Sequence, residues 1–352
     1  MLPLELPLTP DPDWAATLAR HAEGLDALHL SPGHPALADA RHRMESADQK
    51  ALHDAIDHLP DTDIFILLNA RLHTPDKYFS ATHLNAAADT LDRLAEHPNV
   101  RGLVFADAYL LQALSDARPA TASRLEAVPS INTRLDSAPA ALAMLGFIES
   151  TAFRSPSRLV LDRSLNRDMA RLAETSDRLR TARPGIKLLL IANEGCLPDC
   201  PYKPVHDAQI ALANEHLCPD RTFTTNRDLG CIRRFLSDPA TVLASPFIRP
   251  EDAHLYAPHI DGLKLCGRNL GTPFLQRALK AYLAESHPGN VLNLLDTLSD
   301  LANHLEVPSA SLPPDFAEHV TTCDKNCRDC GWCARLMERI GVRHEPELER
   351  LR

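Results

Sequence analysis

The sequence has no cysteine before Cys196, although the 352-residue chain contains nine cysteines in all. Its N-terminus also lacks a basic stretch followed by an apolar one, so we expect no secretory signal and place the protein in the reducing cytoplasm. Cysteines in that compartment more often bind metals or act in catalysis than form disulfides. Their confinement to the second half of the chain favours a dedicated metal or redox site over scattered structural thiols.

Three further absences narrow the function. No run approaches about eighteen apolar residues, so no membrane-spanning helix is expected. The net charge is −10 and no basic face or tail is visible, which argues against duplex nucleic acid as a partner. The motifs H-E-x-x-H, G-x-S-x-G, G-x-x-x-x-G-K-S/T and G-x-G-x-x-G are also missing, so the common metalloprotease, serine hydrolase and nucleotide-binding signatures are excluded.

What the sequence does have is 44% hydrophobic and 24% charged residues, the composition of a globular protein with a sizeable core. Short apolar runs alternate along it with amphipathic stretches, and each run is bounded by polar residues, proline or glycine. Eight such runs are expected to be strands: 25–30, 64–69, 100–107, 125–133, 157–162, 187–193, 245–249 and 262–267. Eight strands alternating with helices predict an α/β fold, a (β/α)8 barrel of the TIM type.

Two segments interrupt this alternation. Residues 194–243 form a long, cysteine-bearing insertion between the sixth and seventh predicted strands. Residues 291–352 form a helical and cysteine-rich extension after the last one. The predicted organisation is therefore a barrel over residues 1–290, with one insertion and one C-terminal extension.

Polar residues recur just after the predicted strands, where barrel enzymes build their active sites. They are Asn69, Arg71, Asp107, Asn132, Arg134, Asp162, Arg163, Asn193, Glu194, Arg249, Lys264 and Arg268. A guanidinium group pairs with a carboxylate through two hydrogen bonds, so the arginines are candidates to hold an anionic substrate. These candidates are Arg71, Arg134, Arg163, Arg249 and Arg268. Asp162, Glu194 and His206 are the candidates for proton transfer.

The first group of cysteines begins in NEGCLPDCP, directly after the apolar run KLLLIAN. Cys196 and Cys200 lie there, at what would be the mouth of the barrel. Thiolates are soft ligands that suit iron–sulfur clusters, zinc or copper(I). Cys231 is the expected third ligand. The fourth stays open among Cys218, Cys266, His206 and a cysteine of the tail.

The second group lies in the tail, where TTCDKNCRDCGWC holds Cys323, Cys327, Cys330 and Cys333 within eleven residues. This density is similar to that of ferredoxin sequences and predicts a bound metal. An iron–sulfur cluster is favoured over a structural zinc ion, and the tail has the further option of lending one ligand to the first group. Its C-x3-C-x2-C spacing is that of radical S-adenosylmethionine enzymes, but there the motif follows an early barrel strand.

Several stretches resemble one known family. LVLDRSLNRD, IKLLLIANEGCLPDCPYKPVHD, SPFIRPEDAHLY and GLKLCGRNLGTPFLQRALKAYL are similar to the barrel family of collagenase-like peptidases, which also contains the ubiquinone-hydroxylation proteins UbiU and UbiV. The similarity is good over residues 125–290 and weak before them. Its most specific parts are the C-x3-C-P pair followed by a histidine and the segment I-R-P-E-D-x-x-x-Y.

The resemblance implies a barrel that carries an oxygen-sensitive 4Fe–4S cluster held by four cysteines. Cys196 and Cys200 match the close pair of the family, and Cys231 matches a later ligand. Members with understood roles take part in oxygen-independent hydroxylation, and UbiU and UbiV act as a pair. The chain lacks the H-G-A/S-x-C signature of the peptidase members, and its four-cysteine tail departs from the hydroxylation proteins, which indicates a side branch.

The expected function is therefore an iron–sulfur redox enzyme of the hydroxylase type, or a partner subunit of one. It would bind one 4Fe–4S cluster or two, with zinc as the alternative in the tail. Its partners would be an unknown small or macromolecular substrate, an electron donor, and a second copy of the chain or a related barrel protein. The alternatives are a peptidase, as the family's name says, and a non-catalytic metal-bound scaffold subunit.

Overall fold

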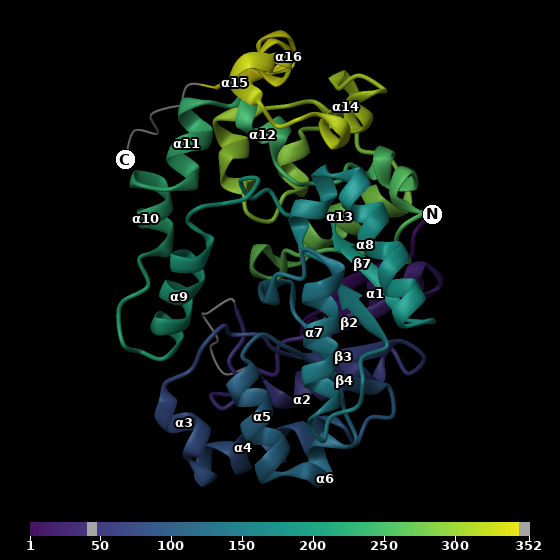
Figure 1. The fold of residues 1–352 in the computed structure, drawn as a ribbon, viewed down its shortest axis with the longest axis vertical. Helices are drawn as coiled ribbons and strands as arrows, with labels where there is room; N and C mark the ends of the chain where they lie inside the picture. Colours follow the sequence, from purple (N-terminus) through teal and green to yellow (C-terminus); the bar gives the residue numbers. More distant parts are fainter. Residues whose placement is uncertain (41–47, 345–352) are drawn as a thin grey trace.

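Eight parallel strands form the centre of the protein (Figure 1). The computed structural model describes residues 1–40 and 48–344. The strands are β1 (Leu4–Leu8), β2 (Leu25–Leu30), β3 (Asp63–Leu68), β4 (Val100–Phe105), β5 (Glu126–Pro129), β6 (Arg158–Val160), β7 (Lys187–Ile191) and β8 (Gly262–Lys264). They pair in the order β5-β4-β3-β2-β1-β8-β7-β6, so that β1 lies between β2 and β8.

The barrel is nearly closed between its two end strands, β5 and β6. Glu126 forms a parallel bridge with Arg154, a few residues before β6. The backbone N–H of Ala127 donates to the carbonyl of Arg154 at 3.1 Å, and the N–H of Arg154 donates to Leu125 at 2.9 Å. The predicted (β/α)8 barrel of the TIM type is therefore confirmed.

One predicted strand is wrong, because residues 245–249 form none. This segment runs past the end of β7 and makes one backbone hydrogen bond there, from Ile248 to Ala192 at 2.8 Å. The eighth strand is instead β1, which the sequence analysis missed because its sequence, LELPL, contains a proline. Pro7 is tolerated because β1 pairs with β8 only at Leu4 and Glu5, so the missing N–H lies beyond that ladder.

Amphipathic helices cover the outside of the barrel wall. They are α1 (Pro12–Arg20), α2 (Gln49–Asp57), α4 (Ala81–Leu94), α5 (Ala108–Ala117), α7 (Ala138–Glu149), α8 (Met169–Ala182) and α13 (Gly271–Leu283), with the short α3 (Pro75–Phe79) and α6 (Pro119–Ala122) in the connections. In α1, the Asp11 side chain accepts hydrogen bonds from the first turn, and Trp14 is fully buried. Such buried faces and the outward side chains of the strands make up the main core.

The inside of the barrel is divided into an apolar and a charged half. Side chains alternate between the two faces of a strand, so residues two apart in β1, β2, β6 and β8 share the inner face. The apolar half comprises Ala27, Phe65, Leu67, Val104 and Val128. The charged half comprises Glu5, His29, Arg158 and Lys264, all buried and joined by hydrogen bonds.

The rest of the chain forms a second core beyond one end of the barrel. Between β7 and β8 lie α9 (Lys203–Asn214), α10 (Thr222–Asp228), α11 (Cys231–Ser237) and α12 (Ala240–Ala244); after α13 lie β9 (Leu305–Glu306), α14 (Phe316–Thr322), α15 (Cys327–Cys330), α16 (Trp332–Ile340) and β10 (Val342–Arg343). Figure 1 shows α9, α10 and α11 along one side of the molecule and α14, α15 and α16 at its end. The rings of Phe247 and Phe316 stack in this core, with their centroids 6.1 Å apart. In the described ranges, no helix has the length and apolarity that a membrane span requires.

Candidate functional site

Cys196 belongs to a buried polar group at the carboxyl ends of β6 and β7. Arg163 follows β6 and donates from Nη1 to the sulfur of Cys196 at 3.3 Å. Glu194 follows β7, forms an ion pair with Arg163 and accepts from the same sulfur at 3.5 Å. Burial, reinforced by the charge of Glu194, raises the pKa of Cys196 to about 12. The structure therefore brings together three residues that the sequence analysis proposed for different roles.

The loop that carries Cys196 is fixed by contacts from distant segments. The N–H of Gly195 donates to Thr297 Oγ1 at 3.0 Å, and a Cβ at this glycine would lie 2.6 Å from the Leu298 side chain. Ser245 Oγ donates to the carbonyl of Cys196 at 2.7 Å. This close approach leaves no room for a side chain at position 195 and so requires glycine there. The position of the Cys196 thiol therefore depends on the C-terminal extension as well as on β7.

Cys200 and Cys231 lie near Cys196. Both are half-buried and pack against the second core. After burial, the charge of Cys200 is the main cause that raises the pKa of Cys231, and it also raises that of Cys196. Of the three thiols predicted as ligands, Cys200 therefore lies close enough to influence the ionisation of the other two.

The candidates for a fourth ligand lie elsewhere or have structural contacts. Cys218 is exposed after the end of α9, whereas Cys200 precedes its start, and a helix of 12 residues is about 18 Å long. Cys266 is half-buried at the end of β8, where its N–H donates to Asn193 Oδ1 at 2.7 Å. His206 lies half-buried in the first turns of α9.

The four tail cysteines also lie near one another. After burial, the charges of Cys327, Cys323 and Cys330 raise the pKa of Cys333 to about 11. Cys327 and Cys330 are exposed on α15, and Cys333 packs at the edge of the second core. The tail therefore presents a second group of thiols, at the surface rather than at the barrel mouth.

Both groups suit a soft metal by the chemistry of their donors, since thiolates bind iron, zinc and copper(I). Their arrangement is looser than that of a finished site. In residues 1–40 and 48–344, no three His, Cys, Asp or Glu side chains converge on one point as metal ligands would. The residues therefore fit a thiolate-bound metal in kind, whereas the side chains as described do not form its ligand sphere.

Four of the five predicted substrate-binding arginines already pair with carboxylates of the chain. The pairs are Arg71–Asp207 at 2.7 Å, Arg163–Glu194, Arg249–Asp252 at 2.8 Å and Arg268–Asp39 at 2.8 Å. Arg134 is exposed and takes a left-handed backbone conformation, with φ of 57°. An anionic substrate at any of these four arginines would therefore share the guanidinium with a carboxylate of the chain or displace it.

The proton-transfer candidates lie in two places. Asp162 is buried beside Arg163, and its carboxylate accepts from the N–H of Ser164 at 2.9 Å. Glu194 lies next to it in the buried group of Cys196. Asp162 and Glu194 both act on Arg163 of this group, whereas His206 belongs to α9.

Helix α9 lies across the mouth of the barrel. At its start, Lys203 contacts Asn132 after β5 at 3.3 Å, and its Asp207 pairs with Arg71 after β3. At its end, Glu215 pairs with Lys77 at 2.8 Å. These contacts place one covering helix over the polar ends of several strands.

The sequence analysis missed His73, which follows β3 and is buried at the same end of the barrel. Its Nδ1 lies 2.9 Å from Oδ2 of Asp107, one of the polar residues expected after β4. The signal that the analysis overlooked was a histidine within a few residues of the strand-end residues Asn69 and Arg71.

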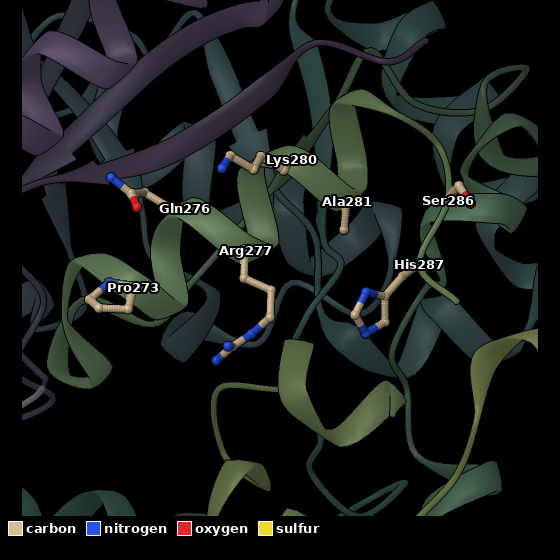
Figure 2. A pocket seen from close by; sticks show the side chains of 7 residues that line it. All are labelled: Pro273, Gln276, Arg277, Lys280, Ala281, Ser286 and His287. Atoms are coloured by element: carbon tan, nitrogen blue, oxygen red, sulfur yellow. The ribbon is translucent and has the colours of Figure 1, made fainter. Parts of the chain in front are cut away.

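A surface pocket lies away from these groups. Figure 2 shows it beside α13, lined by Gln276, Arg277 and Lys280 of the helix and by Ser286 and His287 of the following loop. It contains no cysteine and no predicted site residue. We therefore place the candidate active site at the barrel mouth and not in this pocket.

Fold and site together define an α/β barrel protein with a buried, cysteine-bearing mouth. The chain is 30% identical over 182 residues to a protein of Methanocaldococcus jannaschii named uncharacterized protease MJ1657, a match that covers 51% of this chain and 52% of that protein. The match thus spans about half the length of that relative. The fold is similar to the structure of the U32 peptidase Mk0906, with a TM-score of 0.45 and 18% identity over 63% of this chain and 81% of that one. No family model matches the chain.

Proposed function

We propose that the protein is an enzyme whose reaction takes place at the barrel mouth, at a metal centre held by cysteine thiolates. The observation that carries this proposal is the buried group of Arg163, Glu194 and Cys196, with Cys200 and Cys231 beside it. Half-buried cysteines at the catalytic end of a barrel, one of which accepts a guanidinium hydrogen bond, suit a metal-thiolate site. The reaction we favour is a redox one of the oxygen-independent hydroxylase type.

The residues of the chain have distinct roles in this proposal. Cys196, Cys200 and Cys231 would hold an iron–sulfur cluster, which supplies one-electron transfer when bound. Arg163 would keep its hydrogen bond to the Cys196 sulfur, and Glu194 would hold the guanidinium in place. Hydrogen bonds to the sulfurs stabilise negative charge on such a centre and adjust its potential.

The four tail thiols would hold a second cluster or a structural zinc ion. Because they lie at the surface, a second cluster there would be accessible to an electron donor. A pairing partner, either a second copy or a related barrel protein, is part of the same proposal. A stable partner that co-purifies without any bound substrate-sized ligand would instead support a scaffold role.

Peptide hydrolysis is the second candidate, and the comparisons favour it. The relative and the structural neighbour are named a protease and a peptidase, and neither name mentions iron or a redox reaction. The same barrel mouth would then bind a peptide. Since the match spans only about half of the relative, we propose peptidase activity for this chain and do not infer it from the relative's name alone.

One set of measurements separates these candidates. Iron, sulfide, zinc and visible absorption are measured on protein purified without oxygen, for the wild type and for the variants Cys196→Ala and Cys218→Ala. About four irons per chain indicate one cluster and about eight indicate two. Cys196→Ala should lose the absorption of at least one cluster, whereas the exposed Cys218→Ala should keep it. Unchanged iron content in Cys196→Ala would rule out the mouth cluster.

Hydrolysis is tested on the same preparations. A panel of peptides is incubated with the metal-loaded and metal-free protein, and cleavage is followed by mass spectrometry. Cleavage by the metal-free protein would establish the peptidase function over the redox one. Zinc without iron would leave peptide hydrolysis as the better proposal.

A further inference from the structure

The loop after β3 places His73 in a buried polar site that the proposed function does not use. The side chain of His73 has no exposed surface, and its Nδ1 lies 2.9 Å from Oδ2 of Asp107. The hydroxyl of Tyr78 donates to the same oxygen at 2.7 Å. The other oxygen of Asp107 accepts from the backbone N–H groups of Tyr109 and Leu110 at the start of α5. Asp107 is thus held by four donors and fixes the orientation of His73.

This network determines which nitrogen of His73 is available. Burial acts to raise the pKa of Asp107, but the hydrogen bonds from His73, Tyr78 and Leu110 outweigh it and lower that pKa. An ionised carboxylate only accepts hydrogen bonds, so the proton between the two groups lies on Nδ1 of His73. Its Nε2 then faces the protein interior and, among the described residues, contacts no donor or acceptor.

A second imidazole nitrogen in the same region is also buried without a hydrogen-bond partner among the described residues. Nε2 of His83, in the first turn of α4, is buried and has no hydrogen-bond partner in the part of the chain that the structure describes. Burial, followed by the charge of Lys77, lowers the pKa of His83 to about 4, so this ring is neutral near pH 7. The centroids of the two rings lie 6.5 Å apart, with an angle of 52° between the ring planes.

The spacing of the rings indicates what fits between them. One oxygen atom that hydrogen-bonds to both Nε2 atoms at about 2.8 Å, at a tetrahedral angle, places the centroids about 6.5 Å apart. A tetrahedral metal ion at about 2.0 Å from each nitrogen would bring them to about 5 Å. A metal would also need a third ligand, and no group of three ligating side chains occurs in residues 1–40 and 48–344. The centroid distance of 6.5 Å is therefore long enough for one bridging oxygen atom and too long for a metal ion bound directly to both nitrogens.

We propose that His73 and His83 form a binding site for one hydroxyl group, from water or from an alcohol group of a substrate, and that His73 accepts its proton. A hydroxyl both donates and accepts, so it satisfies His73 Nε2 and either tautomer of His83. When the proton moves, the O–H bond breaks and a bond from hydrogen to Nε2 forms. The electron pair of the broken bond stays on the oxygen, which uses it to bond to an electrophilic atom of the substrate, and Asp107 balances the charge of the imidazolium. This is the arrangement of a histidine general base oriented by a carboxylate.

The insertion covers this site. Glu215, at the end of α9, pairs with Lys77 at 2.8 Å and accepts a hydrogen bond from Thr74 of the loop that carries His73. Cys200 precedes the start of the same helix. The hydroxyl site and the thiol site therefore lie near opposite ends of α9, and the inference about His73 holds whether or not the thiols bind a metal.

The test is a crystal structure of the full chain at a resolution that shows single water molecules, with a second crystal soaked in methanol. An oxygen atom within about 3.2 Å of both Nε2 atoms supports the site. If methanol replaces this oxygen, the site accepts an alcohol group; if the water stays, its ligand is water. An empty space, an atom bonded to one ring alone, or a metal with anomalous scattering overturns the proposal.

Proton acceptance is tested in solution by nitrogen NMR of histidine-labelled protein. We expect the wild type to show His73 with its proton on Nδ1. In Asp107→Asn, the asparagine still caps α5, but its amide group can donate as well as accept a hydrogen bond. The proton of His73 is then no longer held on Nδ1, so the form protonated on Nε2 gains population. Asn132→Asp, at another strand end, is the control and should leave the His73 signals unchanged. A wild type protonated on Nε2 alone would overturn the role of His73. These readouts do not depend on iron or activity, so failure here is distinct from failure of the proposed function.

Discussion

Replacing Glu5 with glutamine tests the charged half of the barrel interior. Glu5 Oε2 lies 2.7 Å from Nζ of Lys264, and Oε1 lies 3.2 Å from Nη1 of Arg158. All three side chains are more than nine-tenths buried. Burial acts to raise the pKa of Glu5, but the charges of Lys264 and Arg158 outweigh it and lower that pKa, so the carboxylate is ionised.

Glu5→Gln removes one negative charge and leaves the buried Lys264 facing an amide, while Arg158 keeps Asp26 at 2.8 Å. Breaking a buried ion pair by removing one partner costs about 3 to 5 kcal/mol. Unfolding entropy is about 2.1 cal/mol/K per residue, or roughly 0.7 kcal/mol/K for 352 residues. The expected fall in Tm is therefore about 4 to 7 °C, measured by calorimetry and checked by urea unfolding.

Two further variants make this prediction specific. Glu174→Gln removes an exposed partner of Arg178, 3.3 Å away on α8, and should cost less than about 1 kcal/mol. The double variant Glu5→Leu with Lys264→Met removes both charges of the buried pair and should recover most of the loss, since apolar replacement of a buried pair is often neutral. If Glu5→Gln costs no more than Glu174→Gln, the reasoning about the buried network is refuted.

Three other predictions concern stability. Burial, followed by the charges of Lys264 and Arg268, lowers the pKa of His29 well below its usual value, so the native state stays unprotonated. Stability should then fall as pH drops below about 6.5, by up to about 1.4 kcal/mol per pH unit, and His29→Asn should remove this part of the slope in urea titrations. Gly267 has φ of +125° and its Cβ would lie 2.1 Å from the ring of Phe274, so Gly267→Ala should cost about 1 to 3 kcal/mol by urea unfolding. Phe316→Ala should cost about 3 to 5 kcal/mol and also shift the near-ultraviolet spectrum of Trp332, 6.2 Å away; an unchanged spectrum would contradict their packing.

The architecture could be predicted largely because buried parallel strands have a strong sequence pattern. Leu25–Leu30 was predicted with its observed bounds, and the six other observed strands that were predicted overlap their predicted ranges within about four residues at each end. Residues 245–249 share the apolar composition of a strand, and Phe247 and Ile248 are fully buried, but in irregular backbone. An apolar composition indicates that a segment is buried, but burial alone does not distinguish a strand from a loop that crosses a core.

The site was predictable only in part, because its key contacts join residues far apart in the chain. The position of Cys196 just after the apolar run KLLLIAN was enough to predict that it lies at the barrel mouth, since that position follows from the strand alone. The partner of Arg71 is Asp207, 136 residues away, and no local pattern indicates such a pair. The predicted role of Arg71 rested on its position, whereas its partner depends on where α9 crosses the mouth.

The position of β1 has a consequence for how the chain matures. This strand, the first of the eight barrel strands in chain order, pairs with β2 on one side and β8 on the other, and Glu5 and Lys264 are 259 residues apart. At about 5 to 20 residues per second, a ribosome needs roughly 13 to 50 seconds to make the intervening chain. During that interval β1 has an unpaired edge and Glu5 lacks its lysine partner. The nascent chain therefore carries an incomplete barrel with an open strand edge, the kind of surface that other chains can join, until its last strand emerges.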